Sequence, residues 1–417
     1  MKTHIPVRKL VPMNKRFFGW RVVAAAFVLA VFGWGVGFYG PPVFLQTVRE
    51  ARGWSVAIVS TAVTTHFLIG ALVVANLPKL YRLFGVPRVT KLAAVSLAAG
   101  VVGWSLAAEP WQLFVATLFS GAGWVGMGAA AINAIVATWF ARARPAALAM
   151  AYNGASIGGV IFAPLWVAAI GWLGFPMATM AIGAVMVVAI WILADLFFAT
   201  TPSGMGLTQD GDAVGGPLRS VTSPLARPLP GPLLWRDPRF LTLAAGMACG
   251  LFAQIGLLAH LYSLLVPVLG AGSAGILLGA ATAVAIVGRT SVGWMMPVGA
   301  DRRLWLSFSY AVQVAGSLGL LLAGGSDTAL LILGVLLFGL GIGNATSVPP
   351  LIAQVEFVKE DVARVVPLIV AMSQAGYAFA PALFGLLRDT DTAPRLFIAA
   401  ATIQMAAILF MLLGRRR

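Results

Sequence analysis

Long apolar stretches dominate this chain, and short polar segments separate them. A helix needs about 20 mostly apolar residues to cross the hydrocarbon core of a bilayer. Twelve stretches reach that length, which predicts an all-α integral membrane protein with twelve spanning helices. The predicted spans are 18–47, 55–78, 88–108, 111–139, 145–170, 175–199, 239–269, 272–297, 303–323, 327–354, 364–388 and 393–413.

One polar segment is longer than the others. Residues 200–238 are rich in Pro, Gly, Ser and Thr, which is typical of a flexible linker. It would divide the chain into two bundles of six helices, 1–199 and 239–417.

Two motifs recur in both predicted halves at nearly the same spacing. Phe119-Ser-Gly-Ala-Gly123 is matched by Phe338-Gly-Leu-Gly341, and Phe162-Ala-Pro164 by Phe379-Ala-Pro381. Such a parallel duplication gives two halves related by a pseudo-two-fold axis. It is a repeat type of transporters, whose binding site lies at the interface between the repeats.

Composition excludes several other classes. Of the 417 residues, 60% are apolar and only 10% are charged, whereas soluble domains carry about 25% charged residues. A soluble enzyme or a disordered chain is therefore excluded. The one cysteine, Cys249, excludes an intrachain disulfide.

The net charge of +15 does not indicate a nucleic-acid partner, because the basic residues lie in short clusters between apolar stretches. Such clusters usually set orientation in a membrane. With the N-terminus inside, nearly all Lys and Arg fall on the inner side. The exceptions are Arg49, Arg52, Arg388 and Arg395 on the outer side and Arg289 within a span. We therefore expect cytoplasmic termini in an inner (plasma) membrane.

A recognisable signature runs from the second predicted span through the loop after it. Gly70, Arg82, Gly85 and Arg88 fit the Gly-rich, Asp-Arg, Gly-Arg pattern of the major facilitator superfamily, and Tyr81 stands at the position of its acid. The equivalent loop in the second half keeps the acid, as Asp301-Arg302. With twelve spans and a central linker, the whole chain resembles this superfamily. The resemblance implies secondary transport by alternating access, with these loops as gating elements.

Three further stretches resemble the bacterial monocarboxylate and oxalate–formate branch. They are Thr138-Trp-Phe140, Pro202–Leu207 with Asp210-Gly211, and Gly288-Arg289. The resemblance implies a small organic anion, most simply a monocarboxylate, as substrate. Some charges of that branch are missing here: no lysine accompanies Pro41-Pro42, and Ala285 stands where an acid precedes the arginine.

Arg289 is the strongest candidate for the site. It lies about 12 Å from the inner end of its predicted span, at 1.5 Å per residue, and a charge at that depth usually faces a cavity or a partner. No acid of the sequence is an obvious partner. We expect it to bind a substrate carboxylate through its guanidinium fork. The alternative is an arginine that clamps helices or bonds to backbone carbonyls.

His260 and Tyr39 are the next candidates. His260 could bind substrate or carry a coupled proton, since histidine titrates near neutral pH, or it could lie at the outer mouth. Whether a proton is coupled stays open. Tyr39 lies where Gly40, Pro41 and Pro42 should interrupt the first helix, an arrangement that transporters use around ligands, although an interfacial tyrosine is the alternative.

Uncharged polar residues complete the predicted site, and a helix-to-helix hydrogen bond is the alternative for each. They are Asn133, Asn344, Gln374 and Tyr377.

No catalytic pattern accompanies these residues. The sequence has no P-loop, no His-Glu-x-x-His and no cysteine pair. We therefore expect no enzyme activity, no cofactor and no metal, and a monomer whose partners are the substrate and the bilayer. Two alternatives stay open: export of drugs or other amphiphiles by the same fold, and a membrane receptor that does not transport.

Overall fold

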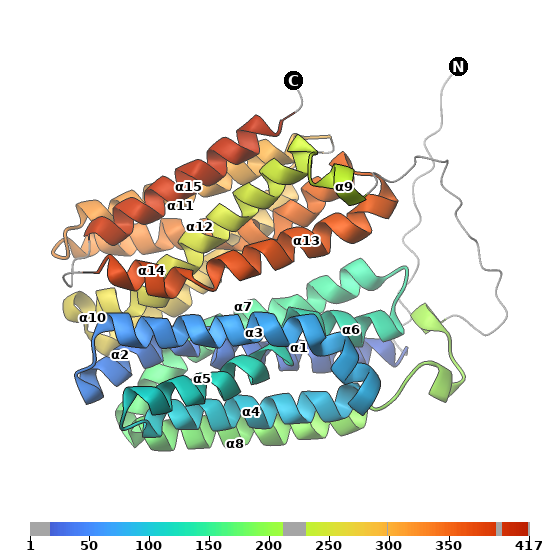
Figure 1. Ribbon diagram of the computed structural model, residues 1–417, viewed down its shortest axis with the longest axis horizontal. Coiled ribbons are helices and arrows are strands. Elements are labelled where there is room, and N and C mark those ends of the chain that lie inside the picture. Colours follow the sequence, from blue (N-terminus) through green and yellow to red (C-terminus); the bar gives the residue numbers. More distant parts are fainter. Residues whose placement is uncertain (1–16, 212–230, 298, 389–393, 416–417) are drawn as a thin grey trace.

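The structure is a computed structural model that describes residues 17–211, 231–297, 299–388 and 394–415. Helices make up nearly all of this part (Figure 1). In the first half they are α1 (Gly19–Gly37), α2 (Gly40–Arg52), α3 (Val56–Phe84), α4 (Val86–Leu106), α5 (Pro110–Val125), α6 (Ala129–Trp139), α7 (Arg144–Leu173) and α8 (Phe175–Leu193). In the second half they are α9 (Gly231–Leu234), α10 (Pro238–Met295), α11 (Arg302–Leu322), α12 (Thr328–Glu356), α13 (Lys359–Tyr377), α14 (Ala380–Leu386) and α15 (Pro394–Leu413).

These helices make twelve membrane crossings. Eleven continuous or nearly continuous stretches are long and apolar enough to span a bilayer, and one of them, α10, has 58 residues. A straight helix of that length would measure about 87 Å, nearly three times the hydrocarbon thickness. Gly270 divides α10 into two crossings, because its φ of 74° and ψ of 160° reverse the chain. The predicted fold class and its twelve spans are thus confirmed.

Three crossings are broken near their middle. The first breaks between α1 and α2 at Phe38 and Tyr39, just before Gly40 and two prolines. Because Pro41 has no N–H, the carbonyl of Gly37 loses its helical donor, and His66 Nε2 donates to it at 2.9 Å. The fourth crossing breaks at 126–128, and the eleventh at 378–379, before Pro381.

The crossings pack as two bundles, which Figure 1 shows as a blue-to-green layer and a yellow-to-red layer. In the first bundle α1 packs on α7, and α4 packs on α5 and α8. In the second, α11 packs on α12 and α15. We call the end of the bundles where α7 and α13 begin the linker end, and the end that carries Gly53 and Gly270 the far end.

The bundles meet along a seam that runs from the far end to the middle of the molecule. Second-half residues lie against α7, with Gly275 beside Val167 and Gly279 beside Val160. On the other side of the seam, α14 packs on α3 and α10 packs on α2.

The first part of the central segment folds against the first bundle. Asp210 accepts hydrogen bonds from the backbone N–H groups of Ala141, Arg142 and Ala143, at 2.8 Å from Arg142. These donors lie just before α7 and at its N-cap, Ala143, where backbone N–H groups lack helical acceptors. Residues 201–211 are therefore ordered by a specific cap, which the prediction of a flexible linker did not anticipate. Residues 212–230 lie outside the described residues.

Candidate functional site

Arg289 lies on the seam between the bundles. Its Nη2 atom donates a 2.6 Å hydrogen bond to the hydroxyl of Ser156 in α7, and its Cβ packs beside Gly343 of α12. Its side chain remains partly exposed. Within the described part of the chain, no carboxylate forms an ion pair with it. The guanidinium therefore has one neutral partner and free donors, which suits an anionic ligand.

Tyr39 lies on the same seam, about two helical turns closer to the far end than Arg289. A Cβ placed on Gly159 would lie 2.6 Å from both the Tyr39 ring and the Thr282 methyl group. The absent side chain of Gly159 thus lets helices from both halves meet at this point. The predicted break in the first helix is confirmed, and it places Tyr39 in the interior rather than in an interfacial belt.

Asn344 lies one residue beyond the glycine that touches Arg289. Its side chain is 2% exposed, and its Oδ1 has no hydrogen-bond partner in the described part of the chain. A buried amide oxygen without a donor is costly, so Asn344 is a candidate to accept a hydrogen bond from a ligand or a water molecule.

Asn133 makes its contacts within the first bundle. It donates to the backbone oxygen of Ala129 at 3.1 Å and to the Tyr152 hydroxyl. This geometry favours the helix-packing interpretation for Asn133.

Gln374 and Tyr377 lie in the last turn of α13, just before the break in the eleventh crossing. The Gln374 side chain is partly exposed and makes no hydrogen bond within the described residues. The Tyr377 ring packs edge-on against Phe67 of α3, with 6.1 Å between ring centroids. Tyr377 therefore takes part in the contact between the halves.

His260 lies nearer the far end than Arg289. It comes 10 residues before Gly270 and Arg289 comes 19 after it, so their depths differ by about 13 Å at 1.5 Å per residue. The imidazole is fully buried, Nε2 donates to the carbonyl of Pro381 at 2.9 Å, and Nδ1 has no partner within the described residues. The structure thus does not bring His260 together with Arg289.

The same region holds a cap that one half supplies to the other. The hydroxyl of Thr64 in α3 accepts a 3.0 Å hydrogen bond from the backbone N–H of Ala382, in the first turn of α14. The N-cap residue of α14, Phe379, has no side-chain cap of its own. Thr64, in the first half, therefore provides a hydrogen-bond acceptor for the N-terminus of α14, in the second half.

The two signature loops lie at the linker end and differ in their chemistry. In the first loop Arg82 and Arg88 are exposed and Gly85 has a φ of 80°, whereas Gly70 lies in the middle of α3 and packs against Trp124. Tyr81, at the position of the acid, packs with Leu77 and Val89.

In the second loop the acid has defined partners. Asp301 caps α11 by accepting from the backbone N–H of Arg303 at 2.9 Å, and it pairs with Arg415 at 2.6 Å. Arg302 donates to the carbonyl of Leu351. Burial acts to raise the pKa of Asp301, but the hydrogen bonds from Arg415 and the backbone outweigh it and hold that pKa below its usual value.

A second cluster beside this loop was not predicted from the sequence. Arg303 is 1% exposed and forks onto both carboxylate oxygens of Glu356, at 2.6 and 2.8 Å. Nearby, hydrogen bonding from Arg239 lowers the pKa of Asp237. Arg239 also donates to the backbone carbonyl of Glu356 at 3.1 Å, and Arg303 donates to the carbonyl of Arg239 at 2.9 Å, so these contacts tie α10, α11 and α12 together at the linker end.

Sequence reasoning also missed Ser156 and Thr282. Serine and threonine are common in membrane helices, where they bond to their own backbone or to a neighbouring helix. Ser156 stands between Gly154 and Gly158, a pattern typical of close helix packing. Only the docking of the halves singles it out.

Twelve crossings in two bundles, joined along a seam that holds Arg289 without an ion pair among the described residues, define the fold of a secondary transporter. Residues 22–381 match the Major Facilitator Superfamily, and the chain belongs to this family. It is a multi-pass membrane transporter rather than an enzyme.

Solved structures of transporters share this fold at low sequence identity. A D-xylose-proton symporter superposes with a TM-score of 0.72 and 12% identity, covering 95% of this chain and 97% of that one. The D323A mutant of the nucleoside transporter NupG gives 0.69 and 11%, covering 95% and 100%. A bacterial homolog of the human lysosomal transporter Spinster, in an inward-facing and occupied conformation, gives 0.64 and 15%, covering 96% of each chain.

A curated relative matches part of the sequence more closely. "MFS-type transporter 1" from Ophiocordyceps sp. (strain BCC 1869) is 31% identical over 188 residues. The match spans 43% of this chain and 40% of the relative.

Proposed function

We propose that this transporter moves a small organic anion, most simply a monocarboxylate, across an inner membrane by alternating access. The supporting observation is Arg289, a charged side chain within a membrane crossing that bonds to neutral Ser156 and forms no ion pair among the described residues. A charge within a membrane crossing is costly without a counter-ion. A substrate carboxylate would supply that counter-ion during each transport cycle.

The polar groups around the seam would orient the rest of the substrate. Tyr39 and Thr282 lie about 10 Å further toward the far end than Arg289, at 1.5 Å per residue. The amide oxygen of Asn344 has no hydrogen-bond partner among the described residues. A substrate whose carboxylate binds Arg289 would reach toward Tyr39 with a short polar tail. Gln374 and Tyr377 would contact the substrate when the seam opens.

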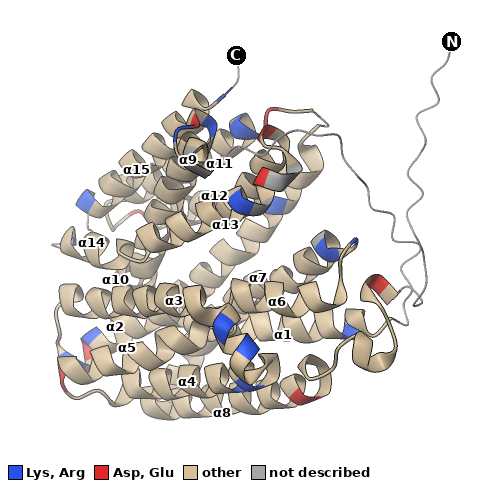
Figure 2. Ribbon diagram, turned by 45° about the vertical axis from the view of Figure 1, so that its right-hand side comes forward, with Lys and Arg blue, Asp and Glu red and all other residues tan. Residues whose placement is uncertain are grey.

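The charge distribution supports a cytoplasmic linker end. Figure 2 shows most Lys and Arg segments toward that end and a smaller group at the far end. Arg49 and Arg52 lie in the last turn of α2, beside Gly53 at the far end. Basic residues concentrate on the cytoplasmic side of membrane proteins. With this orientation, the contacts along the seam would close the outer side, and the structure would represent an inward-facing state.

A proton-coupled form of this mechanism would use His260. Its partner, the carbonyl of Pro381, lies at the break of the eleventh crossing. Protonation of Nδ1 would place a charge in the closed outer part of the seam and favour its opening. Proton and anion would then be coupled through the conformation of the protein and not through direct contact.

Ligand-induced thermal stabilisation of the purified protein tests the substrate class. The panel holds short monocarboxylates, the matching dicarboxylates and the matching neutral amides. A ligand at 100 times its Kd stabilises the folded state by about 2.7 kcal/mol. We expect a monocarboxylate to raise the Tm of the wild type and of the control Arg21→Gln, whose side chain is exposed.

The same acid should give no shift with Arg289→Gln. A Tm shift that persists in Arg289→Gln, or that the neutral amide reproduces, would overturn the proposal. Stabilisation by amphiphilic cations alone would instead support an exporter of drugs.

A further inference from the structure

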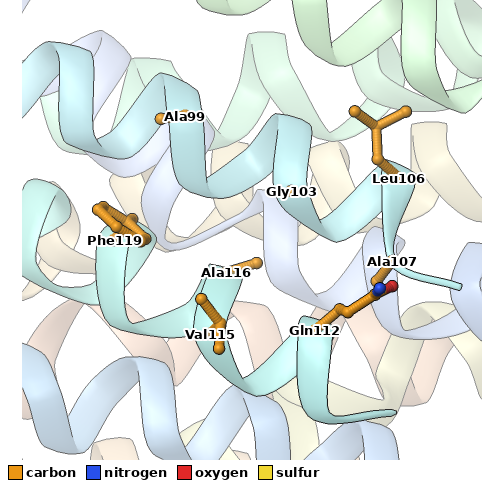
Figure 3. A pocket seen from close by; sticks show the side chains of 8 residues that line it. All are labelled: Ala99, Gly103, Leu106, Ala107, Gln112, Val115, Ala116 and Phe119. Atoms are coloured by element: carbon orange, nitrogen blue, oxygen red, sulfur yellow. The ribbon is translucent and has the colours of Figure 1, made fainter. Parts of the chain in front are cut away.

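An apolar groove lies on the outer face of the first bundle, between α4 and α5. It has a volume of about 400 Å³, and Figure 3 shows the residues that line it. Ala99 and Phe119 lie at one end, and Ala107 and Gln112 at the other, with Val115 and Ala116 between them. Its walls are exposed, with Leu106 at 52%, Val115 at 43% and Phe119 at 51%. Because both helices cross the membrane, this face is solvated by lipid.

Close packing of small residues creates the groove. A Cβ on Gly100 would lie 2.2 Å from the backbone N of Ser120, and one on Gly103 would lie 2.8 Å from the Ala116 Cβ. Ser96 strengthens the contact by donating to the carbonyl of Phe119 at 2.8 Å. The helices therefore touch through their backbones, as small residues allow in membranes. The small residues Ala99, Gly103 and Ala116 leave the outer side of this contact open.

The groove also has one polar end. Gln112 Oε1 accepts from the backbone N–H groups of Ala108 and Glu109, at 2.7 and 3.1 Å. Its Nε2 donates to no residue within the described part of the chain. Trp111 beside it is 65% exposed, as is usual for tryptophan at the boundary between hydrocarbon and headgroups. The free amide donors thus lie at the depth of lipid ester groups.

We propose that this groove binds one acyl chain of a membrane glycerolipid. The chain would lie over Gly103 and Ala116 toward Phe119, and its ester carbonyl would accept a hydrogen bond from Gln112 Nε2. An empty groove would forfeit dispersion contacts along its lining. Lipid surrounds the membrane-spanning part of this face, and an acyl chain carries both the apolar length that fits the groove and a carbonyl that can accept from Gln112. The proposal is independent of the transported substrate.

Photo-crosslinking in nanodiscs tests the site. The probe is a phosphatidylcholine with a diazirine in the middle of one acyl chain, and the adducts are mapped by peptide mass spectrometry. We expect them to concentrate on α4 and α5 around the groove. Ala99→Leu, at an exposed position, fills the groove and should lower that labelling at least fivefold. Ala184→Leu, at an exposed position of α8, should leave it unchanged.

A second variant tests the polar end. Gln112→Glu keeps the oxygen that accepts from Ala108 and Glu109 but removes the amide donor. We expect a shift of the adducts along the groove, with an unchanged Tm. Adducts spread evenly over all lipid-facing helices, or groove labelling that survives Ala99→Leu, would each overturn the proposal.

Discussion

Arg289 and Ser156 are 133 residues apart and come from opposite halves of the transporter, yet their side chains share a 2.6 Å hydrogen bond. Of the contacts between the halves described above, this one lies nearest the linker end. It therefore connects the fixed charge of the site to the relative position of the two bundles. We therefore expect substitutions at this contact to change both the affinity for the ligand and the relative position of the two bundles.

Replacing Ser156 by alanine should weaken ligand binding moderately. The hydroxyl holds one nitrogen of the guanidinium, and a net hydrogen bond contributes about 1 kcal/mol. We expect the Kd of the stabilising acid to rise about fivefold, as measured by titration calorimetry. Ser156→Thr should retain wild-type affinity because it keeps the hydroxyl. Equal losses in both variants would contradict a role for the hydrogen bond.

Gly159→Ala should prevent the halves from meeting as they do here. The added Cβ would lie 2.6 Å from the Tyr39 ring and the Thr282 side chain, and both are buried and cannot move away cheaply. We expect at least a tenfold loss of flux in proteoliposomes. Gly171→Ala is the matched control. Gly171 lies in the same helix, α7, and a Cβ placed there would meet nothing within 4 Å. Similar flux in the two variants would argue against this contact in the transport cycle.

Thr64→Val should open the far end of the seam. The cap on Ala382 exists only while the halves are closed there, and loss of a cap costs about 0.5–2 kcal/mol. The closed state should therefore lose population by a factor of about 2 to 30.

Thiol labelling measures this opening in a Cys249→Ser background with Ser60→Cys, a buried position beside Gly385. Labelling should accelerate with Thr64→Val and not with Thr61→Val, whose side chain is exposed. An unchanged rate would show that the cap does not hold the far end closed.

The Asp301 cap predicts a specific dependence of stability on pH. Its pKa is lower in the folded protein than the usual 3.8. The ionised Asp301 carboxylate therefore stabilises the folded protein fully when the pH is above the usual pKa. This stabilisation is lost as the pH falls through the lower pKa of the folded state.

Asp301→Ala removes the cap and the pair with Arg415 and should cost about 0.5–2 kcal/mol. Asp301→Asn keeps a capping oxygen and should cost about 1 kcal/mol or less, as expected for an exposed pair. The Tm difference between wild type and Asp301→Ala should be constant from pH 5 to 8 and shrink in acid. A difference that varies strongly near pH 7 would contradict this assignment.

Much of the fold follows from local features of the sequence. Apolar length predicts the twelve crossings, and Gly40 with Pro41 and Pro42 predicts the break at Tyr39. Arg289 could be selected from the sequence because a charge is rare in an apolar span.

The arrangement of the site depends on how the halves dock, which local patterns do not encode. Spacing along α10 gives the depth of His260 but does not show that it meets Pro381. Likewise, Ser156 in a Gly-rich stretch is indistinguishable from a packing serine until its partner is known. Asp210 folds back on α7 through contacts almost 70 residues away in sequence.

Uptake by proteoliposomes tests the central role of Arg289 most directly. The transported acid is compared with its neutral amide in wild type, Arg289→Lys and Arg289→Gln. Hydrogen bonds to a charged group contribute about 1.5–3 kcal/mol, or about tenfold to a hundredfold in binding.

We predict that Arg289→Gln lowers acid uptake at limiting substrate by that factor. Arg289→Lys should retain part of the uptake because it keeps the charge without the planar fork. Equal uptake of acid and amide by the wild type, or undiminished acid uptake by Arg289→Gln, would contradict the proposal that Arg289 binds the transported anion.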